Sequence, residues 1–293
     1  MSLGLRSNVI CGSPHETIPL GHDQHDTPPV LVMTSSFSGN IQARMLPSKT
    51  TPDLLGGMWC LLQEAQAVPS RLLWDNETGI GRGKLTDPAA AFAGVLGCEI
   101  KLLKARDPES KGMVERMNRF FRQRFMHGRQ FASPDDFNAQ IADWLPIANA
   151  RYSRSRRGKP SDLVVIDRAQ MWPLSPIAPE TMFRNTIRLP RDYYVRVLTN
   201  DYSVDPSMIG RLVDVTANLN TVTVSHDGQL VASPRPGLGP AADDHRPGAC
   251  GAGEGAAGAV PGPHQSLVGP DPGGGRNTGS RQLRQAVRRR HQR

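Results

Sequence analysis

Along the first half of the chain, short apolar runs alternate with segments whose apolar residues recur at helical spacing. The apolar runs predict strands at residues 30–33, 41–45, 72–74 and 100–103. A helix is expected to begin at Thr51-Pro52-Asp53, where a capping hydroxyl, a proline and an acid suit the first turn. A second helix is expected from Asp87-Pro88. This alternation predicts an α/β layered domain.

The pattern changes twice in the rest of the chain. A helix is expected after Ser133, then a basic segment, and then strands with a period of two around Tyr193-Tyr194. No aromatic residue follows Tyr202, and Gly, Pro, Ala and Arg dominate the end, so this end should not bury a core. The expected divisions are an irregular N-terminal remnant (residues 1–28), an α/β core (29–150) and a basic linker (151–179). A small β-barrel (180–232) and a disordered tail (233–293) are expected to follow.

The chain is basic, with a formal net charge of +8 and a sequence pI of about 9.7. This balance favours an anionic partner such as nucleic acid, although an ordinary basic surface explains the charge equally well. The four cysteines are scattered and form no Cys-x-x-Cys pair, so neither a zinc knuckle nor a disulfide framework is indicated. No apolar run is long enough for a membrane span, and no signal peptide is evident, so we expect a cytosolic protein.

Two carboxylates are placed as a metal site would require. Asp75 ends the apolar run at residues 72–74, and Glu115 lies on a basic amphipathic segment further along. Ligands of open α/β sheets bind at the ends of strands, and Mg²⁺ or Mn²⁺ prefers hard oxygen ligands. The pair therefore suggests a two-metal site for phosphoryl transfer on nucleic acid.

Each of these residues also has a plainer interpretation. An Asp-Asn pair after a strand is common in turns, and Glu115 could form helical ion pairs with Lys111 and Arg119 on a solvated face. In the functional interpretation Glu115 binds metal and is flanked by cations that contact DNA phosphates, namely Lys111, Arg116, Arg119 and Arg122.

Two other segments are weaker candidates. Residues 22–26 contain two His and two Asp residues, but they lie in a polar loop without a scaffold, and we expect no bound metal there. The glycine-rich segment 79–83 lacks the surroundings of a phosphate-binding P-loop, so it is expected to be a flexible loop beside the site, within reach of DNA.

Several runs resemble the IstA-type transposases of bacterial insertion sequences, namely residues 74–77, 107–116, 131–138, 191–196 and 200–206. The resemblance implies an RNase H-like integrase catalytic core with an Asp-Asp-Glu triad that holds Mg²⁺ or Mn²⁺. Asp75 matches the second member of this triad and Glu115 the third. It also implies a transposase that binds DNA as a homo-oligomer and works with a helper ATPase.

The resemblance fails at the front of the chain. The family's first aspartate lies on the opening strand, where this chain has Val9-Ile10-Cys11-Gly12-Ser13-Pro14. Glu16, Asp23 and Asp26 are near but in the wrong local pattern. A coding run for residues 9–14 read in another frame can encode the family's aspartate-containing segment, and residues 238–247 can be re-read in the same way. We therefore expect a truncated, frame-disrupted transposase with impaired catalysis. The alternatives are a non-catalytic DNA-binding fragment and a metal-dependent nuclease of the same fold.

Overall fold

The computed structural model describes residues 6–12, 17–21, 24–75, 77–103, 120–198 and 200–233. The chain divides into two compact units, Met1–Arg246 and Pro247–Arg293, and every described residue lies in the first unit. The predicted disordered tail, apart from Ser233, lies outside the described residues. Within the described residues, no helix is both long and apolar enough to cross a membrane.

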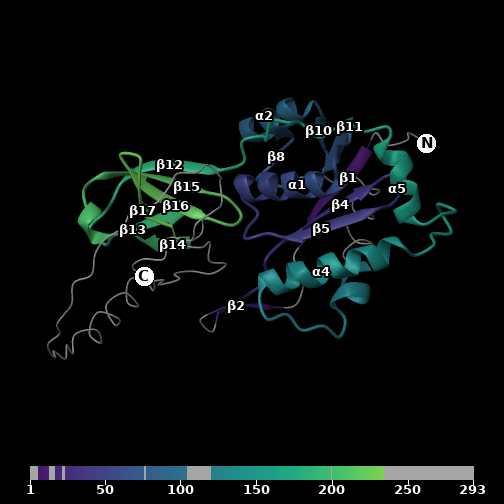
Figure 1. Ribbon diagram of the computed structural model, residues 1–293, viewed down its shortest axis with the longest axis horizontal. Coiled ribbons are helices and arrows are strands. Elements are labelled where there is room, and N and C mark those ends of the chain that lie inside the picture. Colours follow the sequence, from purple (N-terminus) through teal and green to yellow (C-terminus); the bar gives the residue numbers. More distant parts are fainter. Residues whose placement is uncertain are drawn as a thin grey trace, which may run out of the picture. The chain divides into compact units, whose positions relative to one another are not determined.

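A five-stranded mixed sheet forms the core (Figure 1), with the order β10-β7-β1-β4-β5. The strands are β1 (Arg6–Gly12), β4 (Val30–Ser35), β5 (Ile41–Met45), β7 (Arg71–Trp74) and β10 (Glu99–Leu102). Strands β1, β7 and β10 run parallel, while β4 runs antiparallel to both β1 and β5. The four strands predicted from apolar runs are confirmed, and the fold is mixed α/β as expected.

The N-terminal prediction was wrong, because residues 6–12 form the central strand of the sheet rather than an irregular remnant. Residues 7–12 each pair with β4, and β1 also pairs with β7. Val9, Ile10 and Cys11 are buried, which explains why this segment is stable as a strand. A further small hairpin follows, made of β2 (Ile18–Gly21) and β3 (Gln24–Asp26).

Helices cover both faces of the sheet. On one face, α1 (Thr51–Ala65) and α2 (Asp87–Leu96) share a core with Leu31, Leu72 and Trp74. On the other face, α4 (Pro134–Asn149) and the short π-helix η1 (Arg122–Met126) pack against Val30, Val32 and strand β5. The predicted start of α4 is confirmed, since the Asp136 N–H donates to Ser133 Oγ at 3.1 Å.

The basic segment predicted as a linker is part of the core over much of its length. Helix α5 (Pro160–Arg168) carries the fully buried Asp167, which accepts hydrogen bonds from the Ser35 hydroxyl and from the Ser38 N–H at 3.0 Å. Arg156 Nε donates to the Phe37 carbonyl at 2.9 Å. Both contacts tie the segment to the β4–β5 turn. Beyond it, β11 (Trp172–Pro173) pairs with β6 (Ala67–Val68).

The strands after residue 180 do not form the predicted barrel. A four-stranded antiparallel sheet has the order β12-β15-β16-β17, and a separate hairpin joins β13 to β14. In the sheet, β12 spans Phe183–Arg188, β15 spans Leu212–Ala217, β16 spans Val222–His226 and β17 spans Gln229–Ala232. In the hairpin, β13 spans Tyr194–Val197 and β14 spans Asn200–Ser203. Within the described residues β12 and β17 pair on one side only, so the sheet stays open, although the sheet and the hairpin share one apolar core.

Candidate active site

Asp75 lies at the carboxyl end of β7, as predicted. Its backbone N–H donates to the Val9 carbonyl at 3.3 Å, and its carbonyl accepts from the Glu77 N–H at 2.7 Å. The side chain is half-buried. Because β1, β7 and β10 are parallel, their carboxyl ends meet at this edge of the sheet, which is where ligands of such sheets usually bind.

The strand register shows which face Asp75 belongs to. Trp74 pairs with Val9, and both side chains belong to the core beneath α1 and α2. Side chains alternate along a strand, so Asp75 lies on the opposite face, beside Ile10. Ile10 pairs in turn with Val32, which belongs to the core beneath α4 and η1. Asp75 and Ile10 are therefore neighbours on the α4 side.

Strand β1 provides no acid at this position. Ile10 is apolar and only 3% exposed, and no Asp or Glu occurs from Arg6 to Gly12. Cys11 is the nearest alternative ligand, but its side chain belongs to the α1 and α2 core. Burial raises the pKa of the Cys11 thiol to about 12, so the thiol is protonated at neutral pH and is a poor metal ligand.

The loops around Asp75 are held in place by side-chain contacts. Lys49 Nζ lies 3.1 Å from Glu77 Oε1, forming an ion pair across the edge. Asp53, at the start of α1, accepts from Ser48 Oγ at 2.5 Å, and burial raises the pKa of its carboxyl. Within the described ranges, no group of three His, Cys, Asp or Glu residues could hold a metal ion.

The other predicted site residues are not placed. Glu115, Lys111, Arg116 and Arg119 lie outside the described residues, and Arg122 begins η1 without a described side chain. Of the three acids near the front of the chain, Glu16 and Asp23 are also outside, while Asp26 is exposed at the end of β3.

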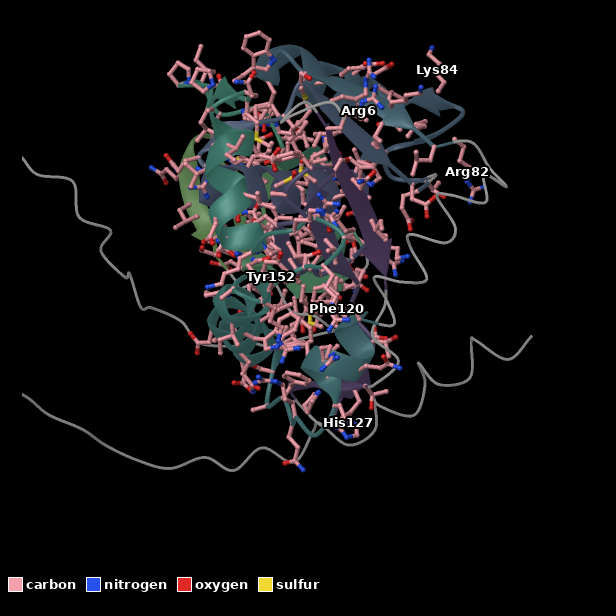
Figure 2. The ribbon with its side chains drawn as sticks, turned by 90° about the vertical axis from the view of Figure 1, so that its right-hand side faces the viewer. Arg6, Arg82, Lys84, Phe120, His127 and Tyr152 are labelled. Atoms are coloured by element: carbon pink, nitrogen blue, oxygen red, sulfur yellow. The ribbon has the colours of Figure 1, made fainter. Side chains whose placement is uncertain are left out.

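The chain re-enters the described structure at Phe120, on the same face as Asp75. Phe120 and Phe121 pack against the core beneath α4, with ring centroids 5.5 and 5.7 Å from Trp144. Figure 2 shows Phe120 over this part of the domain. Phe125 is fully buried in this core, and Phe121 packs against it.

The segment expected to be a flexible glycine-rich loop is instead a short hairpin. Strands β8 (Gly81–Arg82) and β9 (Lys84–Leu85) pair antiparallel, with Arg82 opposite Lys84. Both side chains are exposed. The alternation of small and charged residues was too short to predict strands, so sequence reasoning missed this basic element.

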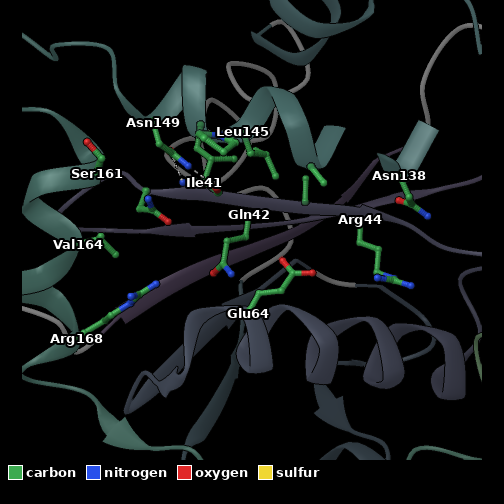
Figure 3. Close-up of a pocket in the computed structure, with 14 residues that line it drawn as sticks. Ile41, Gln42, Arg44, Glu64, Asn138, Leu145, Asn149, Ser161, Val164 and Arg168 are labelled. Atoms are coloured by element: carbon green, nitrogen blue, oxygen red, sulfur yellow. Dashed lines mark hydrogen bonds between the residues drawn. The ribbon is translucent and has the colours of Figure 1, made fainter. Parts of the chain in front are cut away.

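A cavity of about 430 Å³ lies elsewhere, along the edge strand β5 (Figure 3). It is lined by β5, α1, α4 and α5, and includes none of the predicted site residues. Asn149 bonds both the N–H and the carbonyl of Ile41 at 2.9 Å, and Asn138 Oδ1 accepts from the Met45 N–H at 2.8 Å. These amides occupy backbone groups that an edge strand would otherwise expose.

Two known families match this chain, each over a different segment. The family described as "Integrase core domain" matches residues 96–166, and the family "Mu transposase, C-terminal domain" matches residues 174–235. Each match covers less than a quarter of the chain, so the chain is similar to these two families over separate segments. The first match runs through most of α5, which agrees with the structural assignment of that helix to the core.

Two curated relatives are named as transposases. One, from Sinorhizobium fredii, is 28% identical over 64% of this chain and 38% of the relative. The other, from Mycobacterium tuberculosis, is 26% identical over 60% of this chain and 46% of the relative. The chain thus spans less than half the length of these relatives. The catalytic core of BIV integrase matches with 16% identity and a TM-score of 0.42, over 56% of this chain and 96% of that one.

Proposed function

We propose that this chain is the catalytic part of an IstA-type DNA transposase whose metal-dependent strand transfer is impaired. The observation that supports this proposal is the pair formed by Asp75 and Ile10. Asp75 stands at the carboxyl end of β7 as a metal-binding carboxylate should, and its neighbour on β1 is an isoleucine. A two-metal site needs several carboxylates to position two cations near the reacting phosphate.

The donors present fit a divalent cation only in part. Asp75 offers a hard carboxylate oxygen at an open sheet edge, which suits Mg²⁺ or Mn²⁺. We propose Glu115 as its partner, because the chain returns at Phe120 on the face that carries Asp75. Bound there, the cations would activate a water and then a DNA 3′-hydroxyl for attack on phosphorus. With Ile10 in place of an acid, the metal should be held weakly and off position.

Several finer features remain part of the proposal. Lys111, Arg116, Arg119 and Arg122 would contact DNA phosphates, and residues 180–232 would form a second domain. The IstA branch, the helper ATPase, a homo-oligomer on DNA and a bacterial cytoplasmic location follow from the motif resemblance. The frame disruption at both ends is proposed on the same basis.

A strand-transfer assay tests the proposal. The full chain is incubated with DNA carrying the element's ends, a target duplex, Mg²⁺ or Mn²⁺ and the helper ATPase. We expect joining to be undetectable for the chain as it stands and to appear for the Ile10→Asp variant. Adding Asp75→Asn to that variant should abolish joining again.

The same assay separates the rival functions. Efficient joining by the unaltered chain would contradict an impaired site. Metal-dependent cutting of DNA without any dependence on the element's ends would instead favour a nuclease of the same fold. DNA binding without joining in every variant, including Ile10→Asp, would favour a non-catalytic DNA-binding fragment.

A further inference from the structure

We propose that the β8–β9 hairpin is a pre-shaped clamp that holds the phosphate backbone of duplex DNA beside Asp75, through Arg82 and Lys84. This inference rests on the proposed transposase function and names an element that contacts DNA next to the reaction site. It depends on the position of the hairpin, on the contacts that fix its base, and on the charge at its tip.

The hairpin is joined directly to the segment that carries Asp75. Asp75 accepts from the Glu77 N–H through its carbonyl, and the Glu77 carbonyl accepts from the N–H groups of Ile80 and Gly81 at 3.0 and 2.9 Å. One continuous hydrogen-bonded turn thus links the metal-binding candidate to the hairpin. Any anion held at the hairpin is therefore kept near the carboxyl edge of the sheet.

The base of the hairpin is fixed by close packing. Ile80 is fully buried in the α1 and α2 core, and Thr51 Oγ1 donates to the Gly79 carbonyl at 2.6 Å. A Cβ at Gly79 would lie 2.5 Å from the Lys49 carbonyl oxygen. A Cβ at Gly81, where φ is +148°, would lie 2.0 Å from the Lys84 carbonyl oxygen. Only glycine fits these two positions, so the sequence supports one shape.

The tip projects into open space and is strongly basic. Arg82, Gly83 and Lys84 are exposed, and a Cβ built at Gly83 would meet no atom within 4 Å. Figure 2 shows Arg82 and Lys84 reaching outward from the domain. Among the described residues neither cation forms an ion pair. The nearby Glu77 does not neutralise them, because it is paired with Lys49.

The arrangement of the two cations favours a phosphate ligand. Arg82 and Lys84 stand directly opposite each other across the hairpin, and like charges in that position destabilise a strand pair. An anion between them would remove the repulsion. The tip has no aromatic residue to stack on a base. Half or more of the hydrogen bonds between proteins and DNA go to the phosphates and sugars, many of them from Arg and Lys, so this chemistry suits the DNA backbone.

Duplex binding by the full chain tests this proposal, measured by fluorescence anisotropy over a range of salt concentrations. The Arg82→Gln/Lys84→Gln variant removes both tip charges. The matched control, Arg6→Gln/Arg154→Gln, removes two exposed charges from segments that contact the β4–β5 turn, at the opposite edge of the sheet. We expect the slope of log affinity against log salt to fall by about 1.8 for the hairpin variant, since each phosphate contact contributes about 0.9. For the control variant, the same slope should fall by less than about 0.9.

A charge-neutral variant tests the shape of the clamp. Gly81→Ala distorts the hairpin while leaving the net charge unchanged, and a thermal melt checks that the core still folds. We expect it to lose affinity as the charge variant does. Normal binding by either variant would overturn the clamp, as would an equal loss in the control pair. Failure of the unaltered chain to bind any duplex would instead count against the proposed function.

Discussion

Strands β1 and β7 lie side by side in the same sheet and run in the same direction, yet they differ in chemistry. Asp75 follows directly after β7, and at the same level β1 carries Ile10. A buried strand requires only apolar side chains that fit the layers above and below it. A phosphoryl-transfer site requires oxygen ligands at defined positions. The sheet can therefore be complete while the site is not.

Under the proposed function, this difference would allow a frame-disrupted segment to fold. The run Val9-Ile10-Cys11 is apolar and contains two β-branched residues, so it suits a central strand whatever its origin. The backbone of β1 even accepts the Asp75 N–H through Val9. Under the proposed function, such a replacement preserves folding but removes a metal ligand.

The largest effect on stability should come from the residue next to Asp75. Trp74 is fully buried, and Trp74→Ala should lower the free energy of unfolding by about 3–5 kcal/mol. Its register partner Val9 is equally buried but smaller, so Val9→Ala should cost about 2 kcal/mol. Urea denaturation of both variants measures the two values. Equal losses of unfolding free energy in the two variants would contradict the expectation that the larger buried side chain contributes more.

A smaller effect concerns the thiol on β1. Burial raises the Cys11 pKa to about 12, so at pH 8 the reactive thiolate should be rare. We expect iodoacetamide to modify Cys11 at least about 100-fold more slowly in the folded chain than in urea. Mass spectrometry of the modified peptides measures this ratio, with the less buried Cys60 as an internal reference. Rapid modification of Cys11 would reopen the possibility that it binds a metal.

The sequence predicted elements whose signal is local. Strands β4, β5, β7 and β10 were predicted from apolar runs. The position of Asp75 at the carboxyl end of β7 was predicted because the apolar run ends just before it. Strand β1 was missed because its burial depends on partners on β4 and β7, far along the chain.

Helix α5 was taken for a linker because its anchor is also distant. The buried Asp167 is bonded to Ser35, and a pattern of charges gives no sign of such a contact. The open sheet after residue 180 shares its strand pattern with a barrel, since alternation shows which side chains are buried but not whether the edges close.

Under the proposed function, the absence of a carboxylate on β1 limits metal binding. Ile10 and Asp75 are neighbours on adjacent strands, which lie about 4.8 Å apart, so Ile10→Asp would place a second carboxylate beside the first. Isothermal titration with Mn²⁺ compares the unaltered chain with Ile10→Asp. Two controls accompany it: Ile10→Asn, which adds polarity without charge, and the double variant Ile10→Asp/Asp75→Asn.

We predict that Ile10→Asp binds Mn²⁺ at least about tenfold more tightly than the unaltered chain, since affinity rises with the number of charged oxygen ligands. The metal should also raise the melting temperature of this variant. Neither control should gain affinity. Tight Mn²⁺ binding by the unaltered chain, or an affinity of Ile10→Asp that does not depend on Asp75, would contradict the account.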